Sequence, residues 1–297
     1  MVPDARRGIA LKIGATLGFT LMYACAKLGG QVPAGQIIFF RALFSLLTVL
    51  AMVTLTGRLR QVAQTKRLGW HAVRGTVGAS SMFCNFAAVK MLPLADMTAF
   101  TFAMPIFAVV LAAAVLKEKV GIYRASAVLV GFAGVLLMLQ PEGGITAIIA
   151  AGFSTGAALA LCGAFLSAVV VIFIRQMSVT ERSETIVFYF MIIGTILGAI
   201  SMLWWRVPLS YAAMGWLALS GVTGGLGQIC MTFCYRYAEP SLLAPFDYMS
   251  MLWAAALGLL VFGTLPGNYV LAGTALVGAA GIFIAAREHR LSRLGVV

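Results

Sequence analysis

The stretch AGQIIFFRALFSLLTVLAMVTLT, residues 34–56, decides the fold class. It is 23 residues long and carries a single charged side chain, Arg41. A helix rises about 1.5 Å per residue, so a run of this length can cross the roughly 30 Å hydrocarbon core of a bilayer. The stretch therefore predicts a membrane-spanning helix.

The composition extends this prediction to the whole chain. Of its 297 residues, 62% are hydrophobic and only 10% are charged, where soluble domains have about 45–50% and about 25%. The mean hydropathy is +1.00. A soluble domain could not cover its surface with so few charges. The composition indicates a polytopic membrane protein and excludes a soluble enzyme, a nucleic-acid-binding domain and a disordered protein.

Ten apolar runs are long enough to span a membrane. The predicted fold is therefore all-α, a polytopic protein with ten transmembrane helices joined by short connectors. The expected spans are 8–28, 34–56, 71–91, 95–116, 122–140, 149–174, 185–205, 211–235, 242–263 and 268–286.

Basic residues are distributed unevenly between the two sides that these spans define. The side that holds both termini carries 17 of the 21 lysines and arginines, and the opposite side carries 4. Those four are Lys27, Arg41, Lys90 and Arg206. The positive-inside rule predicts that both termini are cytoplasmic. We expect a multi-pass protein of the cell membrane, in bacteria the cytoplasmic membrane.

A weak internal repeat divides the chain near its middle. Leu129–Gly134 recurs as Leu276–Gly281, and Pro93 matches Pro240, both at a displacement of 147 residues. We predict a first repeat over 1–143 and a second over 144–297, each with five spans. Because five is odd, the second repeat would lie inverted in the membrane, as in many secondary transporters.

The chain resembles the drug/metabolite transporter superfamily, in its EamA-like branch of ten-span carriers. The resemblance covers nearly the whole chain and is carried by Phe40–Phe44, Leu116–Lys119, Pro240–Tyr248, Leu252–Ala254 and Phe262–Gly263. It implies solute transport, and a bacterial aromatic amino-acid exporter of this superfamily is the nearest functional comparison. The family often has a glutamate where this chain has Thr264, while Glu118 keeps the equivalent position in the first half. A role that needs both acids is therefore in doubt.

Two equivalent polar helix faces are the sharpest candidates for a transport pathway. One comprises Gly78, Ser81 and Asn85, and the other, displaced by 147 residues, comprises Gly225, Gln228 and Thr232. Spacings of three and four place each set on one face. Polar side chains inside a bilayer turn toward the protein interior or a wet cavity. The alternative is that these faces only pack helices together.

Aromatic residues around these faces suit an amphipathic solute. The complete set predicted to bind substrate is Tyr23, Gly78, Ser81, Asn85, Phe86, Phe100, Pro105, Gln228, Thr232, Phe246, Asp247 and Tyr248. Pro105 either kinks the fourth span beside the cavity or is tolerated by packing. The glycine pairs Gly14/Gly18, Gly152/Gly156 and Gly194/Gly198 are interpreted as close-packing faces.

Charged residues near membrane depth leave alternatives open. Asp247 is expected about five residues into the ninth span, where it would take up a proton or bind an ammonium group, or else accept hydrogen bonds near the cytoplasmic helix end or pair with Arg175 or Arg236. Lys27, Arg41 and Lys90 either attract carboxylates or extend to the outer interface. The five cysteines have no metal-type spacing and are interpreted as free, buried thiols.

These features favour a secondary transporter of amino acids and similar small amphipathic metabolites, operating by alternating access and exporting its substrate. The alternatives are a nucleotide-sugar or phosphate-ester carrier and, less favoured, an intramembrane enzyme. We expect no enzymatic activity, cofactor, metal or nucleic acid. The expected partners are a small-molecule substrate and the bilayer, with the oligomeric state left open between a monomer and a larger assembly.

Overall fold

The structure is a computed structural model. It describes residues 5–55, 57, 62–65, 67–104, single positions and runs of two or three residues between 107 and 137, and residues 154–177, 180–237, 246–247, 249–264 and 266–293. The regular elements of more than two residues within these ranges are all α-helices. The prediction of an all-α fold is confirmed.

The helices coincide closely with the predicted spans. Their bounds are α1 (Ala5–Leu28), α2 (Ala34–Leu55), α4 (Leu68–Met91), α5 (Leu94–Thr101), α9 (Thr155–Met177), α10 (Ser183–Ser201), α11 (Tyr211–Tyr237), α13 (Met249–Phe262) and α14 (Asn268–Arg293). The predicted span 122–140 and the second half of 95–116 lie largely outside the described residues, so the count of ten stays a prediction.

Local chemistry explains where several helices begin and end. The Oγ of Ser154 accepts a hydrogen bond from the Ala157 amide at the start of α9, and Ser210 does the same for Ala213 at the start of α11. Each serine thereby satisfies an amide that has no partner within its helix. At the other end of α13, Gly263 has a φ of 65°, a left-handed conformation that suits glycine and stops the helix.

Four of the described helices are long and apolar enough to cross a membrane. They cover Arg6–Leu28, Ala34–Leu55, Thr155–Ile174 and Glu184–Ser201. Large apolar side chains remain exposed on their outer faces, such as Leu47 (51%) and Ile196 (52%), as expected where lipid replaces water. Trp204 and Trp205, just after α10, are also exposed, in the position of an interfacial aromatic anchor.

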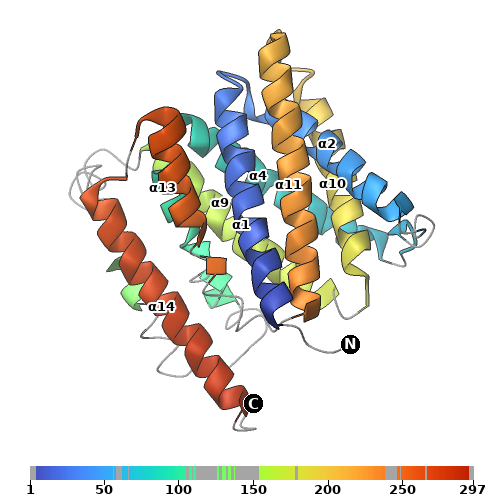
Figure 1. Ribbon diagram of the computed structural model, residues 1–297. Helices are drawn as coiled ribbons and strands as arrows, with labels where there is room; N and C mark the ends of the chain where they lie inside the picture. The colour runs from blue at the N-terminus through green and yellow to red at the C-terminus, as the bar shows by residue number, and fades with distance from the viewer. Residues whose placement is uncertain are drawn as a thin grey trace.

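The helices pack in two corresponding sets of pairs. Helix α1 packs on α11 and α4 packs on α9, while α11 also packs on α2 and α10 also packs on α4. Further contacts join α1 to α13, α5 to α9, α2 to α10 and α5 to α13. The helices α1, α2, α4 and α5 correspond to α9, α10, α11 and α13, in that order. When each helix is replaced by its counterpart, every pair named here becomes a pair that is also named here. Figure 1 shows α1 and α11 running side by side through the middle of the molecule.

Glycines bring these helices into backbone contact. A Cβ on Gly18 of α1 would lie 2.9 Å from the Cα of Gly227 on α11, and one on Gly198 of α10 would lie 2.6 Å from the amide nitrogen of Phe39 on α2. Neither neighbour can move aside, because both are backbone atoms. The predicted close-packing role is confirmed for Gly18 and Gly198, while Gly152 lies outside the described residues.

Two predictions about the sequence need correction. Asp247 does not lie within the ninth span, because α13 begins only at Met249, and Phe246 and Asp247 form a short turn before it. The cysteines are free, as predicted, but Cys162 is exposed, and only Cys25 and Cys234 are classed as buried. An exposed thiol on an apolar helix faces lipid in this architecture.

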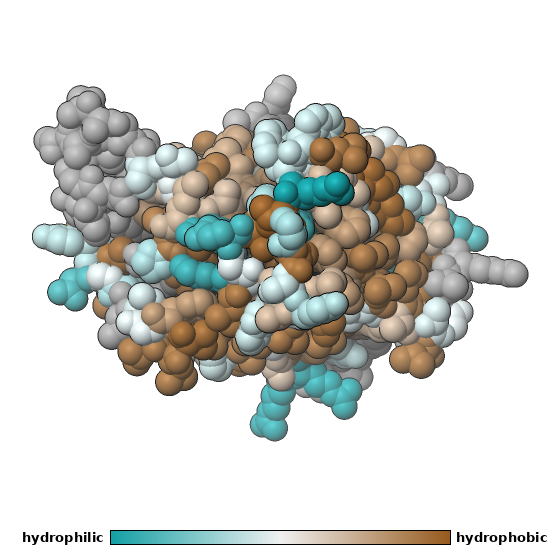
Figure 2. All heavy atoms as spheres, turned by 90° about the horizontal axis from the view of Figure 1, so that it is seen from above, coloured by the Kyte–Doolittle hydropathy of each residue, from teal (hydrophilic) through white to brown (hydrophobic). Residues whose placement is uncertain are grey.

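The first turn of α1 and the last turn of α14 lie at the same end of the molecule (Figure 1). Figure 2 looks onto the opposite end, where a group of hydrophilic residues lies near the middle and apolar residues cover much of the perimeter. An apolar perimeter around a more polar centre is the pattern of a helix bundle set in lipid.

Candidate functional site

A cavity of about 390 Å³ lies among α1, α2, α4, α5, α9, α11 and α13. This volume falls within the roughly 300–1,000 Å³ of small-molecule sites. Its described lining consists of Thr16, Phe19, Thr20, Met22, Tyr23, Arg41, Met82, Asn85, Met97, Thr98, Thr101, Phe102, Met104, Ser167, Gln228, Met231, Asp247 and Ser250.

The lining combines apolar and polar side chains. Three aromatic residues and five methionines make up eight of the 18 lining residues, and six serine or threonine hydroxyls, two amides, one guanidinium and one carboxylate make up the other ten. Tyr23 packs its ring against Phe86, with 5.3 Å between ring centroids. Such a wall can bury the apolar part of a solute while a few groups orient its polar end.

Arg41 supplies the positive charge of this lining. Its side chain is buried, with 2% exposed, so the expectation that it extends to the outer interface is wrong. Its Nε lies 3.0 Å from the Met22 sulfur, and its Nη1 contacts the Met82 sulfur. Thioether sulfurs are weak acceptors, so these contacts position the guanidinium without neutralising it.

Asn85 enters the cavity from α4. Its Nδ2 lies 3.4 Å from Ser81 Oγ, and Ser81 in turn donates to the Gly163 carbonyl (2.9 Å) and pairs with Ser167 (2.8 Å). The buried Oδ1 of Asn85 has no hydrogen-bond partner. Ser81 therefore joins α4 to α9, and the Oδ1 of Asn85 is buried against Gly163 of α9.

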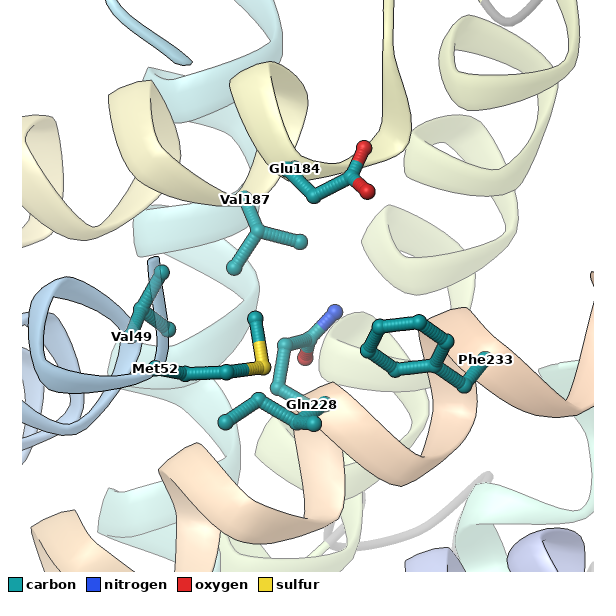
Figure 3. Close-up of a pocket in the computed structure, with 7 residues that line it drawn as sticks. Val49, Met52, Glu184, Val187, Gln228 and Phe233 are labelled. Carbon is teal, nitrogen blue, oxygen red and sulfur yellow. The ribbon is translucent and has the colours of Figure 1, made fainter. Parts of the chain in front are cut away.

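Gln228 lies between the cavity and a second, much smaller pocket. The second pocket has room for about one water molecule (10 Å³) and is also lined by Glu184, Val187 and Phe233. Figure 3 shows Gln228 of α11 and Glu184 of α10 among otherwise apolar side chains. Gln228 is thus shared between the central cavity and a narrow extension toward the start of α10.

Asp247 forms an ion pair at the edge of the cavity. Its Oδ1 lies 2.7 Å from the Nζ of Lys12, whose side chain is 1% exposed against 47% for Asp247. The sequence suggested Arg175 or Arg236 as partners, and the structure shows Lys12 of α1 instead. Because Asp247 lines the cavity, its exposed part belongs to the cavity wall.

A reciprocal pair of lysines joins the ends of α1 and α4. Lys27, near the end of α1, donates to the Leu92 carbonyl after α4 at 2.5 Å. Lys90, near the end of α4, donates to the Ala26 carbonyl at 2.6 Å and also to that of Gly30. Cations at helix C-termini satisfy carbonyls that have no partner within the helix. Here the lysine of each helix donates to carbonyls at the C-terminal end of the other helix.

The structure distributes the predicted site residues unevenly. Tyr23, Asn85, Gln228 and Asp247 line the cavity together. Outside that lining lie Gly78, which packs on Phe190, Ser81, Phe86 and Phe100, which are buried in the core, and Phe246 in the turn before α13. Pro105 and Tyr248 lie outside the described residues, as does the side chain of Thr232.

Several lining residues were not singled out from the sequence. Thr16 and Thr20 lie one turn apart on α1, and their hydroxyls donate to the Ile13 and Thr16 carbonyls. Thr98 of α5 likewise donates to the Leu94 carbonyl. Their four-residue spacing was a visible signal, but threonines that bond to their own helix are also common in lipid-facing helices. Only the packing of α1 against α11 and α13 shows which face is inside.

Comparison with known proteins agrees with this architecture. The model of the EamA-like transporter family matches residues 6–140 and again residues 154–286. A solved crystal structure shares the fold, with a TM-score of 0.66 over 96% of this chain and 98% of that chain, at 18% sequence identity.

Curated relatives match over nearly their full length. The pseudopaline exporter of Pseudomonas aeruginosa is 28% identical, covering 93% of this chain and 95% of the relative. The riboflavin transporter of Vibrio cholerae is 26% identical, covering 97% and 95%. The S-adenosylmethionine uptake transporter of Rickettsia prowazekii is 24% identical, covering 89% and 86%. The two family matches, in a multi-pass helical chain built around a cavity, show that the protein belongs to the EamA-like transporter family and is a membrane transporter, not an enzyme.

Proposed function

We propose that this protein is a secondary transporter that exports amino acids and similar small amphipathic metabolites across the cytoplasmic membrane. The observation that carries the proposal is the central cavity, whose lining combines aromatic rings and methionines with Arg41, Asn85, Gln228 and Asp247. A solute with an apolar body and a small polar end matches that lining, because the polar groups can replace its water shell.

Alternating access between two inverted halves is the proposed mechanism. Two observations support it: the family model matches the chain twice, and most of the packed pairs of described helices correspond under exchange of the halves. The cavity takes its lining from both halves. If the halves exchange conformations, the same cavity opens first to one side and then to the other.

The closed and open ends define the proposed state of the carrier. We propose that the reciprocal contacts of Lys27 and Lys90 keep one end shut and that the end next to Asp247 is open. The proposed topology puts the termini, and with them the Asp247 end, on the cytoplasmic side, because most of the basic residues are predicted there. In this state the cavity takes up substrate from the cytoplasm, as an exporter requires.

The names of the relatives do not agree on a direction of transport, so export by this protein is a proposal. One relative is an exporter, and another takes up S-adenosylmethionine. Their solutes differ in size and charge, so the family alone does not specify a substrate. A nucleotide-sugar or phosphate-ester carrier is the second candidate, and the deep guanidinium of Arg41 is the observation that favours it.

A flux assay tests the proposal. The purified full-length protein in liposomes is offered labelled apolar and aromatic amino acids, a labelled sugar nucleotide and a labelled phosphate ester, with and without a pH gradient. Flux of amino acids above that of empty liposomes is the expected result. Flux of the sugar nucleotide alone would instead establish the second candidate. Comparing flux with and without the pH gradient shows whether transport is coupled to protons.

A further inference from the structure

We propose that Arg41 binds a carboxylate group of the transported solute. The inference rests on the proposed transport function and names the chemistry of the polar end that the cavity recognises.

The first step concerns the charge of Arg41. A guanidinium stays protonated in proteins, and a buried charge in a membrane protein is costly unless an opposite charge or strong acceptors surround it. The acceptors that the structure gives Arg41 are the sulfurs of Met22 and Met82. The carboxylate in the described lining, Asp247, is paired with Lys12. Arg41 is therefore a buried cation facing a cavity without an anionic partner among the described residues.

The second step concerns how the fold holds Arg41 there. Helix α2 lies against α11, where Ser45 donates to the Gly221 carbonyl at 2.8 Å. A Cβ on Gly224 would come within 2.7 Å of the Met22 sulfur and 3.5 Å of Arg41 Nε. The missing side chain at Gly224 thus leaves space for the Met22–Arg41 pair. This arrangement fixes the guanidinium between α1, α4 and α11, which is the geometry of a built site.

The third step places Asn85 next to this cation. Arg41 contacts Met82 of α4, and Asn85 lies three residues after Met82, on the same helix face. Both residues line the cavity. The Oδ1 of Asn85 is buried against Gly163 of α9, so the binding of a carboxylate rests on Arg41.

The charge of the lining favours a carboxylate over a phosphate. Arg41 is the basic residue among the described lining residues, and the charge of Asp247 is balanced by Lys12. A phosphate monoester brings about −1.5 to −2 charges, which one guanidinium does not neutralise. A single carboxylate matches one guanidinium and accepts two parallel hydrogen bonds from it.

The test compares acids with their amides. Flux of L-phenylalanine, L-phenylalaninamide and phenyl phosphate is measured in liposomes containing the wild type, Arg41→Gln, Arg41→Lys or, as a matched control, Arg206→Gln in the exposed loop after α10. We expect the wild type and the control to prefer the acid over the amide at least tenfold. Arg41→Gln should lower acid flux about 10- to 100-fold and remove that preference. Arg41→Lys should retain part of it, because a point charge attracts a carboxylate without the bidentate geometry.

The outcomes separate this inference from the proposed function. Wild-type flux without preference for the acid, or an unchanged preference in Arg41→Gln, overturns the role of Arg41 and leaves transport standing. A preference for phenyl phosphate overturns the choice of a carboxylate. Absence of flux of all three compounds by the wild type refutes the proposed function together with the inference. If Arg41→Gln does not fold, two measurements test the role of Arg41 instead: the preference of the wild type for the acid over the amide, and the reduction of that preference in Arg41→Lys.

Discussion

Lys12 and Asp247 form an ion pair of 2.7 Å that joins α1 to the turn before α13. Lys12 is 1% exposed, whereas the Asp247 side chain is 47% exposed, so one partner belongs to the protein interior and the other to the cavity wall. Because Asp247 lines the cavity, the pair connects the packing of α1 to the site.

Breaking this pair from the exposed side should destabilise the protein. In Asp247→Asn the ammonium of Lys12 stays buried without its counter-charge. The expected loss of stability is about 1–3 kcal/mol, which lies between the losses for breaking a surface ion pair and a fully buried one. Thermal unfolding in detergent measures the loss. In a double-mutant cycle with Lys12→Gln, we expect a coupling energy of at least about 1 kcal/mol. Additive effects of the two substitutions would show that the pair contributes nothing to stability.

Lys90→Gln should loosen the closed end of the carrier. The substitution removes the charge-assisted hydrogen bonds to the Ala26 and Gly30 carbonyls, each of which contributes about 1.5–3 kcal/mol. In a variant without native cysteines, a cysteine at position Thr98 in the cavity should react about tenfold faster with an impermeant reagent added outside. Arg206→Gln is the control, and equal labelling rates in both variants would contradict a gating role.

The amides of Asn85 and Gln228 should matter for transport and not for insertion. Asn85→Leu and Gln228→Leu make their helices more apolar, so both proteins should reach the membrane normally. Substrate affinity should fall by about 1–3 kcal/mol for a lost buried hydrogen-bond partner, measured as an increase in KM of at least about fivefold. Ser80→Leu, on the exposed face of α4, is the matched control. Normal KM values in both leucine variants would show that these amides only pack helices together.

Gly18→Ala should destabilise the contact between α1 and α11. Its Cβ would lie 2.9 Å from the Cα of Gly227, and backbone atoms cannot move aside without separating the helices. The expected cost is about 1–3 kcal/mol, seen as a lower midpoint of thermal unfolding. Gly215→Ala, on α11 with nothing within 4 Å of the added Cβ, should unfold like the wild type or at a slightly higher temperature. Equal midpoints for the two variants would mean that α1 and α11 can separate freely.

Two exposed arginines test the proposed topology. Arg206 follows α10, and Arg182 precedes it, so the two lie on opposite sides if α10 spans the membrane. Placed singly in a variant without native cysteines, Arg206→Cys should react with an impermeant thiol reagent in intact cells. Arg182→Cys should react only after the cells are opened. The reverse pattern would invert the topology and make the Lys27–Lys90 end cytoplasmic.

The sequence specified the helices because crossing a bilayer imposes a length and a composition. The predicted spans 34–56 and 211–235 match α2 and α11 to within two residues, since each run of apolar residues must satisfy its own backbone hydrogen bonds in lipid. The predicted span 242–263 fits less well, because α13 begins only at Met249. Hydropathy alone did not distinguish the turn at Phe246 and Asp247 from the helix that follows.

Helical spacing located part of the site but not all of it. Asn85 and Gln228 were found from the sequence because an amide within an apolar helix needs a polar partner, and both line the cavity. Phe86 and Phe100 have the same aromatic character as Tyr23, yet they are buried in the core while Tyr23 reaches the cavity. A pattern along one helix gives the face on which a residue lies, but not which neighbouring helix covers that face.

The tertiary structure alone decided the electrostatics of the cavity. Arg41 lies in an apolar run, where extension to the interface was as reasonable as burial. Its inward position follows from the glycines of α11, which let α2 approach. Lys12 and Asp247 are 235 positions apart in the sequence, and only the packing of α1 beside α13 brings them within 2.7 Å. Hydrophobic length is a local property of the chain, whereas the pairing of charges depends on which helices become neighbours.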